Sequence, residues 1–199
     1  MTLKIIGTGF GRTGTDSMRH ALNTLGVGPT HHMRELGNQN PLRKHWLELV
    51  DGAEPNWNKL FAGYHACVDW PSAYYWQSLV TEYPDAKVLL TLRSAESWWV
   101  SFEATILKHI IEYPDPTGFA HRLIAEQVFD GRPDDKNHAI AVYNQNVDEV
   151  KATIDSSRLL IHNLGDGWGP LCRWLNLPTP DTEYPKGNSA KEFMTRLIK

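Results

Sequence analysis

The segment GFGRTGTDS, residues 9–17, has the residue types and spacing of an anion-binding turn. It follows the apolar run LKII and precedes a helical pattern. Backbone N–H groups would therefore meet at the positive end of a helix dipole, where an anion is favoured. Glycines let such a turn fold tightly and let a ligand approach the backbone. Arg12 would add a fixed positive charge, and threonine hydroxyls would add donors. The residues expected to hold the anion are Gly11, Arg12, Thr13, Gly14 and Thr15.

Two familiar nucleotide-binding motifs fit this segment incompletely. A dinucleotide-binding turn, G-x-G-x-x-G, is followed about 20 residues later by an acid at the tip of a second strand, and the stretch GVGPTHHMREL offers no such strand. A triphosphate-binding loop carries lysine before Ser or Thr, but Thr15 stands in the lysine position. A third alternative is a glycine turn that only joins a strand to a helix. Asp16 is compatible with a bound anion if its carboxylate points away from the ligand and favours the helix dipole.

A second cationic position follows the apolar run AKVLLTL, residues 86–92. Arg93 would lie at the carboxyl end of that strand, and Ser101, eight residues later in the next helix, can return to the same edge. Such a pair suits a second anionic group. The alternative is that Arg93 forms an ion pair with Glu96 and only closes the edge of the sheet.

The elements that must position these residues alternate between strands and helices. Apolar runs predict strands, and apolar residues at helical spacing predict helices between them. This alternation is typical of an α/β fold with a parallel sheet flanked by helices, in which ligands bind at the carboxyl ends of the strands. Strands are expected at 3–7, 65–70, 86–92 and 158–162, and helices at 14–25, from Pro71 onward, and at 94–110, 138–154 and 167–175.

Length and composition favour one ordinary globular domain over residues 1–199. Hydrophobic residues make up 41% of the chain, charged residues 22%, and the net charge is −3; these values do not favour nucleic acid or an anionic membrane as a partner. No uncharged apolar run approaches about 18 residues, and no leader pattern precedes the first strand. Two cysteines do not make a disulfide framework, so a cytoplasmic location is expected. Residues 112–136, rich in Pro, Asp and Gly, are expected to form a surface lid or linker.

Together these motifs resemble those of the PAPS-dependent sulfotransferases, in particular a soluble bacterial-type subfamily. GFGRTGTDSM resembles the loop that binds the 5′-phosphosulfate, and TLRSAESWWVSF resembles the 3′-phosphate motif, with Arg and Ser eight residues apart. FAGYHACVDWPSAYYW and the closing GDGWGPLCRWLNLPTPDTEYPKGN follow in the family's order, and Lys186 with Gly187 match a loop that folds over the 3′-phosphate. The likeness covers nearly the whole chain. It implies a single-domain, P-loop nucleotide-kinase-like sulfotransferase fold.

The resemblance implies transfer of a sulfuryl group from 3′-phosphoadenosine 5′-phosphosulfate (PAPS) to a hydroxyl or amine of a small-molecule acceptor. Such transfer is close to phosphoryl transfer and needs positioned donors, a cation at the leaving group and a base on the acceptor. No metal is expected, because no spacing of Cys, His and carboxylates points to one. Two alternatives stay open: a non-catalytic nucleotide-binding protein of the same fold and, disfavoured by the missing loop lysine, a P-loop kinase.

Three residues are expected to carry the chemistry. The resemblance places Arg12 where many relatives have a lysine that stabilises the leaving phosphate; arginine supplies the charge but donates no proton near neutral pH. Asp69 in VDWP matches the position of a base histidine in cytosolic sulfotransferases, or alternatively caps a helix that begins at Pro71. His32 in THHM is a second candidate base, or else a packed histidine. Asp69 could also orient His32 as a dyad. The sequence specifies neither the acceptor nor the oligomeric state.

Overall fold

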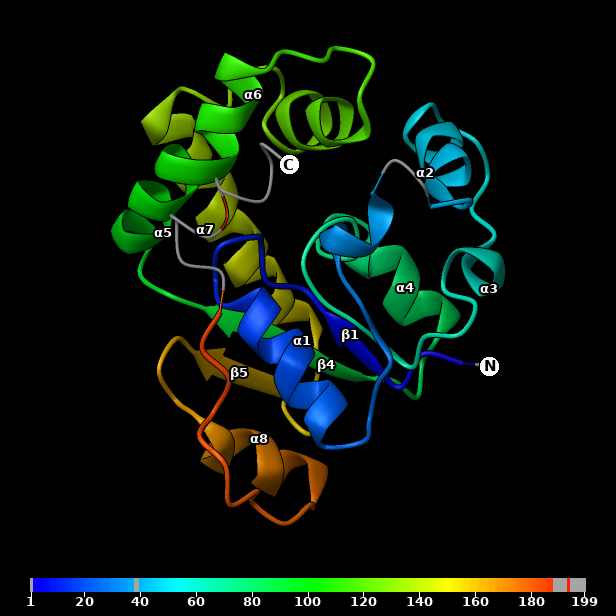
Figure 1. Ribbon diagram of the computed structural model, residues 1–199, viewed down its shortest axis with the longest axis vertical. Coiled ribbons are helices and arrows are strands. Elements are labelled where there is room, and N and C mark those ends of the chain that lie inside the picture. Colours follow the sequence, from blue (N-terminus) through cyan, green and yellow to red (C-terminus); the bar gives the residue numbers. More distant parts are fainter. Residues whose placement is uncertain (1, 38–39, 188–192, 194–199) are drawn as a thin grey trace.

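A five-stranded parallel sheet lies at the centre of the protein (Figure 1). The structure is a computed structural model that describes residues 2–37, 40–187 and 193. The strands are β1 (Ile5–Gly7), β2 (Thr30–His31), β3 (Ala66–Cys67), β4 (Lys87–Leu92) and β5 (Leu159–Asn163). They lie in the order β2-β3-β1-β4-β5, and every neighbouring pair is parallel. The expected α/β fold with a helix-flanked parallel sheet is confirmed.

Helices cover both faces of the sheet and extend beyond its carboxyl edge (Figure 1). The α-helices are α1 (Thr15–Thr24), α2 (Arg43–Val50), α3 (Trp57–Leu60), α4 (Trp76–Glu82), α5 (Ala95–Phe102), α6 (Lys108–Glu112), α7 (Lys136–Thr153) and α8 (Trp168–Leu175). A 3-10 helix, η1 (Met33–Leu36), and two π-helical stretches, η2 (Glu103–Leu107) and η3 (His121–Val128), complete the set. Because α5, η2 and α6 follow one another without a break, the helix expected at 94–110 is confirmed as one helical run.

Consecutive residues of the central strand β1 are buried on opposite faces of the sheet. Ile5 packs with the cluster beneath α1 and α8, whereas Ile6 packs with the larger cluster beneath α4, α5 and α7. In Figure 1, α1 lies in front of the sheet and α7 behind it. Side chains alternate along a strand, so a strand covered on both faces needs an apolar residue at every position. This requirement explains why the consecutive apolar residues Ile5 and Ile6 predict the first strand correctly.

The strand β2 is absent from the sequence-based expectation. It contains only Thr30 and His31, which pair with Ala66 and Cys67 of β3. Two residues show no periodicity, and neither residue is an aliphatic side chain of the kind that marks a buried strand. The strand nevertheless adds an edge to the sheet and delivers the following residue, His32, to the carboxyl end.

Three expected segments differ from the structure. The strand expected at 65–70 is only Ala66–Cys67. The helix expected from Pro71 begins at Trp76, because the intervening residues form turns whose donors, including the hydroxyl of Ser72 and the N–H of Ala73, bind the carbonyl oxygen of Asp69. The segment 112–136 is not a bare lid or linker. It contains η3, whose sequence HRLIAEQV buries its apolar side chains in the main core cluster.

Candidate active site

The turn between β1 and α1 has the backbone geometry of an anion-binding loop. Gly14 precedes the helix with φ of +93°, a conformation that favours glycine. A Cβ on Gly11 would lie 2.6 Å from the ring of Trp70, so the chain can pass there only as glycine. Gly14 supplies no side-chain cap to the ten-residue helix α1. The first N–H groups of the helix therefore suit an anionic ligand.

The two cationic positions expected from the sequence lie together at this turn. Nε of Arg12 donates to Oγ of Ser101 over 3.2 Å, and a terminal N–H of Arg93 donates to the carbonyl oxygen of Arg12 over 3.1 Å. Nε of Arg93 also donates to Oγ of Ser97 over 3.0 Å. Sequence reasoning missed Ser97, although it lies four residues, about one helical turn, after Arg93. The ion pair of Arg93 with Glu96 is not formed.

Glu96, the expected ion-pair partner of Arg93, pairs with a different cation on the surface. Glu96 pairs with Lys136 at 2.8 Å, so the alternative that Arg93 only closes the sheet edge through Glu96 is wrong. Arg93 is fixed at two places instead. Its side chain contacts Ser97, and its backbone carbonyl accepts a hydrogen bond from the hydroxyl of Tyr143 over 2.8 Å. The ring of Tyr143 stacks on Trp98, whose Nε1 donates to the carbonyl of Gly11 over 3.0 Å. Aromatic residues from α5 and α7 thus support both cationic positions.

The two threonines of the loop have different surroundings. The hydroxyl of Thr13 is buried, donates to the carbonyl of Phe10 over 2.6 Å and lies 2.6 Å from the hydroxyl of Thr91. It therefore faces the protein interior and stabilises the turn. The hydroxyl of Thr15 lies instead beside the side chain of His32, 3.3 Å from Nε2, and Thr15 lines the cavity described below.

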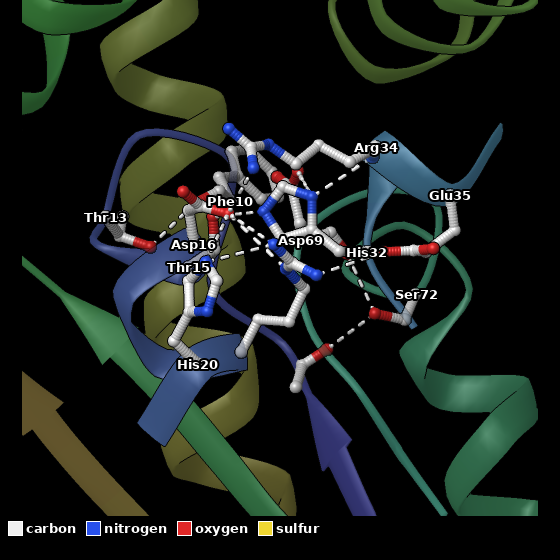
Figure 2. A network of polar contacts seen from close by, with 12 residues as sticks. Phe10, Thr13, Thr15, Asp16, His20, His32, Arg34, Glu35, Asp69 and Ser72 are labelled. Carbon is white, nitrogen blue, oxygen red and sulfur yellow. Dashed lines mark hydrogen bonds and ion pairs between the residues drawn. The ribbon is translucent and has the colours of Figure 1, made fainter. Parts of the chain in front are cut away.

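His32 and Asp69, the two candidate bases, form a buried pair (Figure 2). Nδ1 of His32 lies 3.2 Å from Oδ2 of Asp69, and their side chains are 4% and 8% exposed. His32 directly follows β2 and Asp69 follows β3 by two residues, so adjacent parallel strands deliver both to one edge. The alternative in which Asp69 caps a helix at Pro71 is wrong, because that helix begins at Trp76.

Burial has a large effect on Asp69. It raises the pKa of this carboxyl from its ordinary value to about 7, although hydrogen bonds from two backbone N–H groups and the charge of Arg12 favour the carboxylate. Loss of water around a buried charge disfavours the ionised form. Asp69 therefore takes up or releases a proton near neutral pH, as a general acid or base must.

The imidazole of His32 has two possible arrangements of its protons. The N–H of Arg34 donates to Nδ1 over 3.2 Å, which requires a lone pair there. Donation from Nδ1 to Asp69 requires a proton at the same atom. When Asp69 is ionised, Nδ1 carries the proton and Nε2 has the lone pair. When Asp69 is protonated, Nδ1 is free to accept from Arg34, and Nε2 carries the proton.

A second polar cluster surrounds Asp16 in the first turn of α1 (Figure 2). Oδ1 of Asp16 lies 3.3 Å from terminal nitrogens of both Arg19 and Arg34, and Arg19 also pairs with Glu35 at 3.2 Å. Two guanidinium groups therefore compensate this buried carboxylate. The negative charge next to the glycine turn is compatible with an anion at the loop.

The last two residues expected at the site lie beyond α8. The N–H of Gly187 donates to Oγ of Ser17 in the first turn of α1 over 3.2 Å. Lys186 is exposed and lies 3.7 Å from Glu183. The structure thus brings Gly187 against α1, the helix that follows the glycine turn, whereas Lys186 lies on the surface and its contact with a 3′-phosphate stays a prediction.

A cavity of about 780 Å³ opens beside the His32–Asp69 pair, within the size range of small-molecule sites. One end is lined by Gly11, Arg12, Thr15, His32, Asp69 and Trp70. The rest of the lining comes from η1, Gly37 and α2, from η2, α6, η3 and the segment between α6 and η3, and from Phe193. Arg93 and Ser101 lie outside this lining and connect to it through Arg12.

Two negative findings concern the described part of the chain. Among residues 2–37, 40–187 and 193, no group of three or more His, Cys, Asp or Glu side chains could hold a metal ion. No helix in these ranges combines the length and the apolar character needed to cross a membrane.

Comparisons with known proteins identify the family. The chain is 28% identical over 209 aligned positions to "Ava biosynthesis cluster protein M" of Aspergillus versicolor, which covers 92% of this chain and 80% of that protein. The family described as "Sulfotransferase domain" matches residues 4–193, a range that includes every candidate residue above. With nearly all of its length matched, the chain belongs to the sulfotransferase domain family.

Proposed function

We propose that this protein transfers a sulfuryl group from PAPS to a hydroxyl or amine of a small organic molecule. The observation that carries the proposal is the meeting, around one cavity, of the loop bearing Arg12 with the His32–Asp69 pair. A helix N-terminus with a fixed cation suits a phosphosulfate. A buried base next to that loop suits removal of the acceptor's proton. Membership of the family supports sulfuryl transfer in general.

The loop residues fit the proposed donor. Backbone N–H groups after Gly11 and Gly14, with the guanidinium of Arg12, would hold the phosphosulfate. Arg93 and Ser101 would bind the 3′-phosphate. Although the net charge of the chain is −3, the guanidinium of Arg12 lines the cavity at this turn and supplies a local positive charge for an anion. When bound, PAPS supplies an activated sulfuryl group and a phosphate leaving group.

His32 and Asp69 act in the proposed mechanism as one base. With Asp69 ionised and Nδ1 protonated, Nε2 of His32 accepts the proton of the acceptor hydroxyl as its oxygen forms the new O–S bond. The S–O bond to the phosphate breaks with its electron pair on the departing oxygen, and Arg12 stabilises the negative charge that develops there. The proton on Nδ1 can then pass to Asp69, whose pKa is about 7. Nδ1 is left to accept the N–H of Arg34.

Two measurements test this proposal. Adenosine 3′,5′-bisphosphate should raise the melting temperature of the protein, because at a hundredfold excess over Kd a ligand adds about 2.7 kcal/mol to the free energy of unfolding. ADP and NAD should have little effect. Labelled PAPS should then label members of a panel of alcohols, phenols, amines and sugars. A shift with NAD and none with the bisphosphate would overturn the proposal. Bisphosphate binding without transfer to any acceptor would favour a non-catalytic nucleotide-binding protein.

A further inference from the structure

Arg43 lines the cavity from α2. It is the first residue of α2, and a terminal N–H of its guanidinium donates to the carbonyl of Leu36 over 2.9 Å. Leu36 ends the helix η1, and His32 caps the beginning of the same helix. At a rise of about 2 Å per residue, this helix separates the two positions by about 8 Å. Both Arg43 and His32 line the cavity.

The hydrogen-bond partner of the Arg43 guanidinium is an uncharged backbone carbonyl. Arg34, on the same wall, lies 3.3 Å from the carboxylate of Asp16, whereas the contact of Arg43 is with the Leu36 carbonyl. Within the described ranges no carboxylate lies at ion-pair distance from Arg43. A guanidinium carries five N–H donors in a fixed fork, so the partly buried Arg43 retains donors for a ligand in the cavity.

The cavity wall opposite η1 and α2 carries a group of apolar side chains beside the imidazoles of His109 and His121. It includes Ile106, Ile110, Phe119 and Ile124 from η2, α6, η3 and the residues before η3. Asp115, the acid on this side, is exposed and accepts a hydrogen bond from the hydroxyl of Thr117 over 3.0 Å. A hydrocarbon body would be stabilised along such a wall by removal of its surface from water.

We propose that the acceptor is a hydroxylated apolar acid whose carboxylate binds Arg43. This inference rests on the proposed function, because it uses the same cavity and the same base. The hydroxyl would lie at Nε2 of His32, the hydrocarbon body against Ile110 and its neighbours, and the carboxylate on the guanidinium fork, a favourable bidentate geometry. The helix η1 separates the backbone of His32 from that of Leu36 by about 8 Å, so the hydroxyl and the carboxylate belong at opposite ends of the acceptor. A neutral alcohol with the same body would leave Arg43 without an anionic partner.

Matched acid and ester probes test the inference. The probes are 3-(4-hydroxyphenyl)propanoate and 6-hydroxyhexanoate, each compared with its methyl ester, on the full chain saturated with adenosine 3′,5′-bisphosphate. Titration calorimetry gives the affinities, and kcat/KM with PAPS gives transfer. For at least one pair we expect the acid to bind about tenfold or more tightly than its ester, the range of charge-assisted hydrogen bonds. Arg43→Gln should abolish this preference, and Arg43→Lys should restore part of it.

Lys44→Gln is the matched control, because Lys44 neighbours Arg43 in α2 but is exposed and pairs with Glu48. It should keep the wild-type preference. Equal affinity of acid and ester in both wild-type pairs overturns the inference and needs no variant to fold. A preference that persists in Arg43→Gln also overturns it. Failure of the bisphosphate to bind would contradict the proposed function itself, so the two failures are distinguishable.

Discussion

At the scale of single residues, the orientation of the Arg93 guanidinium is fixed by contacts within the protein. Its guanidinium is held by Oγ of Ser97 and the carbonyl of Arg12. Arg93→Ala should weaken binding of adenosine 3′,5′-bisphosphate by about 10- to 100-fold, the loss of one or two charge-assisted hydrogen bonds. Binding of adenosine 5′-phosphate, which lacks the 3′-phosphate, should change little. Titration calorimetry with both nucleotides checks this.

The control for this comparison is Lys136→Ala. It removes an exposed cation that pairs with Glu96 of α5, the helix that follows Arg93. It should leave both affinities unchanged. If Arg93→Ala weakens both nucleotides equally, Arg93 stabilises the loop and does not recognise the 3′-phosphate.

The His32–Asp69 pair leads to a prediction about pH. Because burial raises the pKa of Asp69 to about 7, its ionised form, and with it the lone pair on Nε2 of His32, becomes populated as the pH rises through 7. The wild-type kcat/KM should therefore increase over this range. Asp69→Asn should lower kcat/KM by about 10²- to 10⁴-fold, as for loss of a general base, and should remove the inflection near pH 7. An unchanged inflection in the variant would show that another group titrates.

At the scale of elements, the sequence predicts those strands and helices that are marked by long apolar runs or by apolar residues at helical spacing. The strand β4 and the helical run after it were predicted, and so was the meeting of Arg93 with the glycine loop, because parallel strands share a carboxyl edge. The strand β2 could not be predicted, since its pairing with β3 depends on backbone hydrogen bonds and not on side-chain pattern. For the same reason the contact between His32 and Asp69 was only one possibility among several.

The strand-turn-helix element carries backbone strain at Arg12. Arg12 has φ of +76°, in the left-handed region that non-glycine residues rarely adopt. Such strain costs of order 1–3 kcal/mol and collects at functional sites. Arg12→Gly should be more stable than Arg12→Ala by about 1 kcal/mol, about 2–4 °C in melting temperature for a chain of this size. Both variants should lose transfer activity.

Asp130 supplies the matched control for strain outside the site, because its φ is +51°. Asp130→Gly should also exceed Asp130→Ala in melting temperature, and both should keep transfer activity. Equal melting temperatures of Arg12→Gly and Arg12→Ala would mean that the loop relaxes when the guanidinium is removed.

At the scale of the whole molecule, two buried groups oppose each other in their effect on stability. His31 is enclosed by the rings of Trp46, Phe61 and Tyr64, and neither ring nitrogen has a hydrogen-bond partner among the described residues. Its burial lowers its pKa to about 3, whereas burial raises that of Asp69 to about 7. One group thus loses its proton on folding, and the other gains one.

These shifts give stability slopes of opposite sign. Between about pH 3 and 6.5 the unfolded chain binds a proton at His31 that the folded chain lacks, so stability rises with pH by about 1.4 kcal/mol per unit. Between about pH 4 and 7 the folded chain holds a proton on Asp69 that the unfolded chain has lost, so stability falls with pH at the same rate. Over the shared range the two slopes cancel in the wild-type protein.

Single variants should reveal each slope. Relative to the wild type, His31→Phe should lose stability with rising pH, because only the effect of the Asp69 proton remains. Asp69→Asn should gain stability with rising pH, because only the effect of the His31 proton remains. The difference from wild type should approach about 1.4 kcal/mol per pH unit in each case, measured by urea unfolding across the shared range. The double variant should bring the slope back toward that of the wild type. Parallel curves for all four proteins would contradict the opposed burial of these two groups.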